Sequence, residues 1–202
     1  MRRYLLIGAT VALLAVPALA FAGATTTTVK VQNNFFSPQT APKTVGAGAI
    51  RWQWQPGAFN HNVRQDVKLF YSGRPTDAPH TFTVIPSAGS FHYYCEVHKI
   101  NGMQGTIKIK PLIVNPTPTS FGVKWSTGSN DTGGKFDVRY RVNGGSWKVW
   151  KNDTTAAQGT FGLNGKPVIV RAGRTYDIQA RSEKSADTSK VSRWSPAARV
   201  TT

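Results

Sequence analysis

The sequence predicts an all-β protein made of two β-sandwich domains. Apolar residues alternate with polar ones in short runs, and 19 Gly and 12 Pro separate those runs. Only 17% of the 202 residues are charged, a composition that matches helical bundles and coiled coils poorly. With 40% hydrophobic and 11% aromatic residues the chain can bury a real core, which argues against wholesale disorder.

Residues 1–22 have the three parts of a secretory signal peptide. Two arginines open the segment, Leu5 to Val16 is apolar, and small residues follow Pro17. Cleavage fits after Ala20 or after Ala22, and we expect it after Ala22. The apolar run is too short to span a bilayer, so we expect no membrane span and a secreted or periplasmic mature protein. The alternative is a buried N-terminal helix.

Residues 23–110 form the first predicted domain, with strands marked by alternation. Ile50, Trp52 and Trp54 alternate with polar residues. In Phe91 to Cys95 every second residue points inward, so Cys95 ends a strand on its inward face. Thr106 to Lys110 is expected to close the domain. The segment Asn115 to Pro118 is interpreted as a turn or linker near the domain boundary.

Residues 111–202 form the second predicted domain, of ordinary domain size. Runs at strand period are again its main signal, and outside the signal peptide no segment predicts a helix. The expected strands are Phe121–Trp125, Phe136–Val142, Trp147–Val149, Val168–Val170, Tyr176–Ala180 and a last one from Trp194 onward.

Charge and cysteine content limit the partners and the chemistry. Lys and Arg number 25 against 9 Asp and Glu, a net charge of +16 that favours anionic partners. The basic residues form no run of five or more, so specific nucleic-acid binding is not expected. The one cysteine, Cys95, excludes a disulfide within the chain. An unpaired thiol in an exported protein needs something to occupy its sulfur.

Four residues have the types and order of a metal site. Cys95, His98 and Met103 stand in Cys-x2-His-x4-Met spacing, and His61 lies upstream. A thiolate and two imidazoles with a weak axial thioether are typical of a blue-copper electron-transfer site. Taken singly, a buried cysteine, a gap-filling methionine and solvated histidines are the commoner interpretations. Together the four favour metal binding, and the methionine argues against zinc, the main rival.

Residues 25–110 resemble a cupredoxin of the plastocyanin and pseudoazurin kind. The resemblance rests on Phe36-Ser37-Pro38, on His61-Asn62-Val63, and on Phe91-x-Tyr-Tyr-Cys-x2-His-x4-Met-x-Gly-Thr-Ile. It implies a Greek-key β-sandwich with one type 1 copper held by His61, Cys95, His98 and Met103, one-electron transfer as the activity, and a role for Asn62 in tying the two ligand loops together. The stretch between His61 and Cys95 is shorter than the family pattern, so we expect trimmed strands or a trimmed loop near the site.

The remaining histidines argue against a copper enzyme. His80 follows Pro79 in an expected loop, and His92 points outward by alternation, so both are interpreted as solvated. Multicopper oxidases and copper nitrite reductases need many more histidine ligands than these two. We therefore predict that the protein is not an enzyme.

Residues 111–202 resemble a fibronectin type III module, an immunoglobulin-like sandwich. The matching features are Trp125, Tyr140, the approach to a tyrosine corner at Ala172–Tyr176, and Ser192-x-Trp194-Ser195-Pro196. We interpret this half as a spacer or docking module whose ligand the sequence does not identify. Trp147 and Trp150 are interpreted as core or rim packing in preference to carbohydrate binding.

The leading prediction is an exported blue-copper protein that carries single electrons between redox partners. Its net positive charge suggests a redox partner with an acidic docking surface. Two alternatives use the same chain: an extracellular binding protein that works through the second domain, and a copper-buffering protein with no redox partner.

Overall fold

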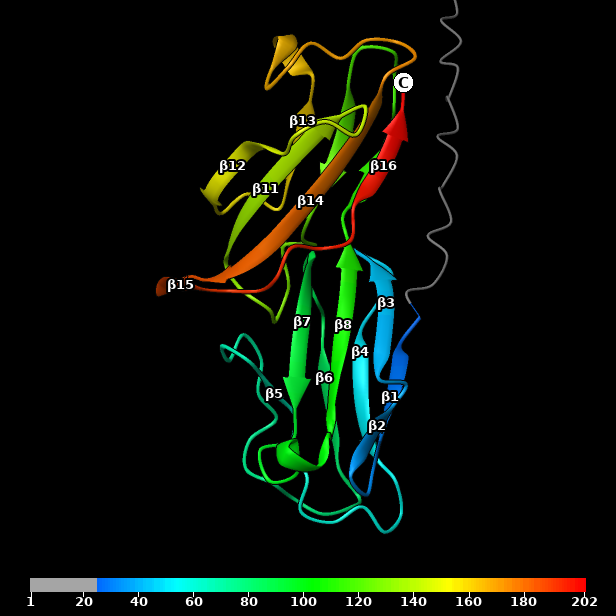
Figure 1. The fold of residues 1–202 in the computed structure, drawn as a ribbon, viewed down its shortest axis with the longest axis vertical. Helices are drawn as coiled ribbons and strands as arrows, with labels where there is room; N and C mark the ends of the chain where they lie inside the picture. The colour runs from blue at the N-terminus through cyan, green and yellow to red at the C-terminus, as the bar shows by residue number, and fades with distance from the viewer. Residues whose placement is uncertain (1–24) are drawn as a thin grey trace, which may run out of the picture.

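The computed structural model describes residues 25–202 and confirms an all-β fold (Figure 1). The predicted signal peptide lies outside the described residues. Within them the only helical elements are two short 3-10 turns, η1 (Lys99–Asn101) and η2 (Leu163–Gly165). No helix in this described part has the length and apolar character needed to cross a membrane.

Eight strands make the first sandwich. They are β1 (Thr27–Gln32), β2 (Phe35–Ser37), β3 (Thr40–Thr44), β4 (Ile50–Trp54), β5 (Arg64–Gln65), β6 (Thr81–Val84), β7 (Gly89–Tyr94) and β8 (Gln104–Lys110). One sheet has the order β2-β1-β4-β6 and the other β3-β8-β7-β5. The pairs β1–β4 and β3–β8 are parallel, and the others are antiparallel.

Aromatic side chains from both sheets fill the first core. The predicted alternation of β4 is confirmed, with Ile50, Trp52 and Trp54 buried and the residues between them exposed. Trp52 from one sheet meets Tyr93 from the other edge-to-face at 5.2 Å between ring centroids. Such contacts fix the spacing of the two sheets and so the start of the loop that follows β7.

The second sandwich is built from the later strands. They are β9 (Leu112–Val114), β10 (Phe121–Lys124), β11 (Lys135–Val142), β12 (Lys148–Thr154), β13 (Gln158–Phe161), β14 (Thr175–Lys184), β15 (Asp187–Val191) and β16 (Ala198–Thr201). A sheet β13-β10-β9 faces a sheet β12-β11-β14-β15, in which β16 also pairs with β14. Phe161 contacts Tyr140 and Tyr176 across this core at 5.0 and 5.7 Å.

Two of the predicted strands in this half are wrong in detail. Val168–Val170 is not a strand: Val170 is buried, but the following Arg171 N–H donates to the Tyr176 hydroxyl oxygen at 2.9 Å and not to a neighbouring strand. The last strand begins at Ala198 and not at Trp194. The Ser195 N–H donates to Ala180 O, but the Ala180 N–H donates to the Ser195 hydroxyl and not to its carbonyl oxygen, so no regular ladder forms there.

Trp147 and Trp150, which the sequence predicts to be packing residues, both contact other side chains of the chain. The Trp150 ring lies 5.5 Å from Trp125 and 5.1 Å from Phe161. The guanidinium groups of Arg139 and Arg141 lie 4.6 and 4.7 Å from the centroid of the Trp147 ring. Neither ring is an open platform for a sugar.

The two sandwiches are stacked end to end and meet through a buried polar joint (Figure 1). Ala88 N–H donates to Trp125 O at 2.7 Å, and Ser90 bridges to Arg193. The Ser182 hydroxyl lies 2.6 Å from Ser87 Oγ and donates to Ala88 O at 2.9 Å. The start of β7 is therefore held by the second sandwich, while its far end leads to the candidate site.

Candidate metal centre

Cys95 follows the last residue of β7, and its side chain is fully buried. The strand places Phe91, Tyr93 and Cys95 inward, as the sequence alternation predicts. The Cys95 N–H donates to Met103 O at 3.1 Å, which closes the loop between β7 and β8. The thiol therefore sits at the end of a rigid ladder instead of in a free loop.

The loop from Cys95 to Met103 turns tightly around η1. Its backbone is closed by Gly102 N–H donating to Lys99 O at 3.0 Å and by Met103 N–H donating to His98 O at 3.2 Å. Gly102 has φ +82°, a left-handed conformation that costs glycine little. This turn brings the His98 ring back over Cys95.

His61 arrives from the long connection between β4 and β5. Its backbone forms a bridge with Thr76, and its side chain is only 1% exposed. Its Nε2 lies 3.3 Å from Asn33 Oδ1, and that oxygen also accepts from the Phe59 N–H. The Asn33 oxygen is thus an acceptor, so His61 carries its proton on Nε2 and its Nδ1 keeps a lone pair.

The electrostatics of His61 favour the neutral ring that a metal needs. Burial lowers the pKa of His61, and the neighbouring His98 lowers it further, against a smaller opposing effect of Asp77. A neutral imidazole is the form that coordinates metals.

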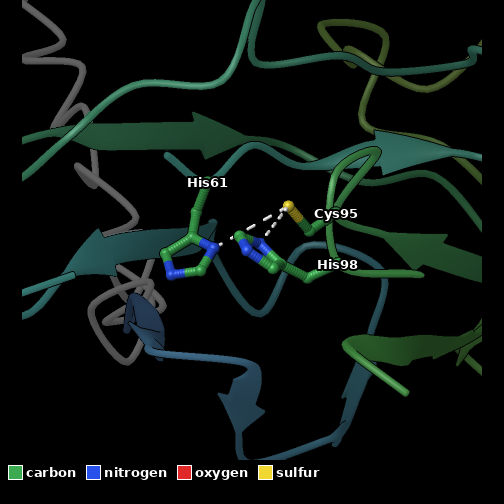
Figure 2. Close-up of side chains that lie close together, drawn as sticks. All are labelled: His61, Cys95 and His98. Atoms are coloured by element: carbon green, nitrogen blue, oxygen red, sulfur yellow. Dashed lines mark hydrogen bonds between the residues drawn. The ribbon is translucent and has the colours of Figure 1, made fainter. Parts of the chain in front are cut away.

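The three donor atoms converge on one point (Figure 2). Cys95 Sγ lies 3.8 Å from His61 Nδ1 and 3.5 Å from His98 Nδ1, and all three atoms lie within 4.8 Å of one another. Bonds of about 2.0 Å to nitrogen and 2.3 Å to sulfur would separate such atoms by roughly 3.5–3.7 Å at tetrahedral to trigonal angles. The cluster therefore fits a type 1 copper site, with no oxygen ligand in the set.

Met103, the fourth predicted ligand, is fully buried at the closed end of the same loop. Its backbone is hydrogen-bonded to the backbones of both Cys95 and His98. Three of the predicted residues are thus brought together by their side chains, and Met103 joins them through its backbone. Its role as the axial donor stays a prediction.

A hydrogen-bond network joins the two ligand loops beside the cluster. Asn62 Oδ1 accepts from the Glu96 N–H at 2.9 Å, while Asn62 Nδ2 donates to Glu96 Oε2 at 2.6 Å. The Glu96 carboxylate also accepts from Arg64 and, at 2.9 Å, from the Tyr71 hydroxyl. Burial opposes ionisation of Glu96, but these donors outweigh it and hold its pKa below its ordinary value.

The role of Asn62 between the loops was expected from the sequence, whereas that of Glu96 was not. One signal was available: Glu96 directly follows the only cysteine, and residues 23–110 hold just two other acidic residues, Asp66 and Asp77. A lone carboxylate beside a candidate ligand indicates a structural partner. The partners themselves, Arg64 and Tyr71, lie too far away in the sequence to be recognised.

The two remaining histidines are less free than the sequence suggested. His92 points outward as predicted, but its Nδ1 lies 2.7 Å from Asp66 Oδ1 and its Nε2 3.0 Å from Gln104 Oε1. The His80 ring packs edge-on against Trp54 at 4.6 Å. The expectation of solvated side chains is therefore met only in part, because both residues are half-buried and each ring has a partner in this domain. Neither ring belongs to the cluster.

Comparisons with known proteins give solved structures only. No protein-family model matches, and neither does any curated protein. A mutant of amicyanin in its reduced state is similar over 41% of this chain and 79% of its own, at 17% identity and a TM-score of 0.35. Pseudoazurin from Hyphomicrobium denitrificans covers 42% and 75% at 14% identity and 0.34. Plastocyanin from Dryopteris crassirhizoma covers 41% and 99% at 20% identity and 0.32.

Plastocyanin and pseudoazurin are the two cupredoxins that the sequence motifs resemble. At these identities and TM-scores the similarity carries no weight for the site. The evidence for a copper site is the set of donor atoms in this chain.

Proposed function

We propose that this chain is a type 1 copper protein that carries single electrons between redox partners and is not an enzyme. The observation that carries the proposal is the convergence of Cys95 Sγ with the Nδ1 atoms of His61 and His98 at 3.8 and 3.5 Å. A buried thiol and two imidazoles, with no carboxylate among them, suit copper in both of its oxidation states.

Four residues have distinct roles in the proposed site. Cys95 and His61 are the buried donors, His98 is the donor nearest solvent, and Met103 is the weak axial donor. The copper, when bound, supplies the one-electron redox change. The chain holds the donors in nearly fixed positions, because each is tied to a ladder or a closed turn, and this limits rearrangement when an electron arrives.

The redox partner is proposed to dock at the end of the molecule that carries His98. Ile100 is 94% exposed and Phe59 66% exposed, and each lies two residues from a donor histidine. Ala58, which precedes Phe59, is buried and does not contribute to this surface. Without Arg2 and Arg3 of the proposed signal peptide, 23 Lys and Arg remain against 9 Asp and Glu, a net charge of +14, and the mature chain is proposed to attract a partner with an acidic docking surface.

Residues 1–22 are proposed to be a signal peptide, residues 23–110 the copper domain and residues 111–202 a fibronectin type III-like module. The Tyr176 hydroxyl, which accepts from Arg171 N–H at 2.9 Å, supports the last part, because a tyrosine bonded to backbone a few residues upstream is typical of immunoglobulin-like sandwiches. By this proposal the mature protein is secreted or periplasmic, and its second domain serves as a spacer or binding module.

Electron self-exchange distinguishes a carrier from a copper store. Mixtures of the reduced and oxidised copper protein should show NMR line broadening near His98 that grows with the oxidised fraction and with protein concentration. Stable copper binding without such exchange would favour copper buffering and would contradict the carrier function.

A further inference from the structure

We infer that Glu96 is a positioning residue that holds the His61 loop against Cys95, and this inference rests on the proposed copper site. Its carboxylate accepts three side-chain hydrogen bonds, from Asn62, Arg64 and Tyr71. All three hydrogen-bond donors come from the stretch that follows His61. A single side chain therefore joins the metal ligand at the end of β7, Cys95, to the metal ligand 34 residues earlier, His61.

The bonds connect Glu96 to both sides of the His61 loop. Asn62 directly follows His61, and its Nδ2 also donates to Gly73 O at 2.9 Å. Arg64 begins β5, which pairs with β7 through Arg64 and Tyr94. Tyr71 lies on the returning part of the loop and bridges back to Arg64. Movement of the loop away from Cys95 would break all three contacts together.

The negative charge is what makes this link strong. Hydrogen bonds to an ionised acceptor are roughly twice as strong as neutral ones, and the Glu96 side chain, 26% exposed, is partly shielded from water. Arg64 donates to one oxygen of Glu96, and Asn62 and Tyr71 donate to the other. An amide at this position has one acceptor oxygen, so its NH2 group would face either the Arg64 donor or the donors of Asn62 and Tyr71. Glu96→Gln should therefore loosen the loop with almost no change in side-chain volume.

Metal-free protein gives a readout that does not depend on copper. Cys95 is the only thiol and is fully buried, so its alkylation by iodoacetamide reports how often the two loops separate. We expect alkylation on the order of tenfold faster in Glu96→Gln than in the wild type, since a charge-assisted bond is lost. Tyr71→Phe, which removes one donor only, should give a smaller change in the same direction.

Asp66→Asn is the matched control. It removes the same carboxylate charge from a half-buried pair in the same sandwich, where Asp66 contacts His92 and none of the metal ligands. Its alkylation rate should equal that of the wild type. Equal rates in Glu96→Gln and Asp66→Asn would overturn the positioning role, whatever the copper results are.

The copper-loaded protein gives the second readout. Glu96→Gln should raise the copper dissociation constant by about 10–100-fold and change the ratio of the visible bands and the electron-spin hyperfine splitting. Asp66→Asn should leave these unchanged. A wild type that binds copper without the intense thiolate band would overturn the proposed function. A normal wild type with an unaltered Glu96→Gln spectrum and affinity would overturn this inference alone.

Discussion

Cys95 Sγ and His98 Nδ1 lie 3.5 Å apart across a single closed turn. The turn is held by backbone hydrogen bonds from Met103 N–H to His98 O and from Cys95 N–H to Met103 O. One closed turn thus holds two of the donors, whereas His61 comes from a separate loop. This arrangement explains why one short segment can provide most of a metal site.

Replacing His98 by glycine should open the metal site to added imidazole more readily than replacing His61 by glycine. His98 is half-buried whereas His61 is 1% exposed. Imidazole should therefore restore the copper–thiolate band in His98→Gly at lower concentration than in His61→Gly. Equal titration curves for the two variants would contradict the assignment of His98 as the metal ligand nearest solvent.

Met103→Leu should keep the copper and the colour and raise the reduction potential. Leucine fills nearly the same volume in this fully buried position, so the fold should be retained. The oxidised state loses its weak axial donor, which favours the reduced state. Cyclic voltammetry measures the shift. An unchanged potential would show that the Met103 sulfur is not an axial ligand.

The local part of the site was predictable because it depends on period and spacing. Alternation along Phe91 to Cys95 gives the buried face of β7 correctly, and the Cys-x2-His spacing corresponds to a turn that returns His98 to the thiol. The contact between His61 and Cys95 was anticipated from the ligand types of the four residues and from the resemblance, because no local pattern relates residues that far apart.

The long-range polar contacts could not be predicted. Glu96 with Tyr71, Asp66 with His92, and Ser87 with Ser182 are each set by how strands from different parts of the chain lie together. Val168–Val170 shows the converse: its β-branched residues match a strand, but a tertiary contact to Tyr176 uses the next N–H.

Stability should fall as pH rises because of Glu183. This side chain is 1% exposed, and burial, together with Asp137, raises its pKa from 4.5 to about 8. The folded state keeps a proton that the unfolded state releases, so the stabilisation is complete below pH 4.5 and is lost as pH rises through about 8. Urea unfolding at about pH 5 and about pH 9 should show this loss in the wild type, and a smaller loss in Glu183→Gln. The exposed Asp187→Asn variant should behave as the wild type, and an equal pH dependence in Glu183→Gln would refute the assignment.

Residues 23–110 alone should fold and bind one copper, but with a lower melting temperature than the full chain. The truncated protein loses the partners of Ser87, Ala88 and Ser90, which hold the start of β7. In the full chain Ser182→Ala should cost about 1–3 kcal/mol, because it leaves buried polar groups unpaired. Differential scanning calorimetry measures both effects. If residues 23–110 failed to bind copper, the proposed domain boundary would be wrong.

A copper titration of residues 23–202, followed by visible absorption and electron-spin resonance, tests the central claim most directly. We expect one equivalent of Cu(II) to give an intense blue band with a narrow hyperfine splitting, and Cys95→Ser to remove that band because an alcohol cannot replace the copper–thiolate bond. His92→Ala, outside the cluster, should leave the spectrum unchanged. A colourless copper complex of the wild type, or a Cys95→Ser protein that stays blue, would contradict the assignment.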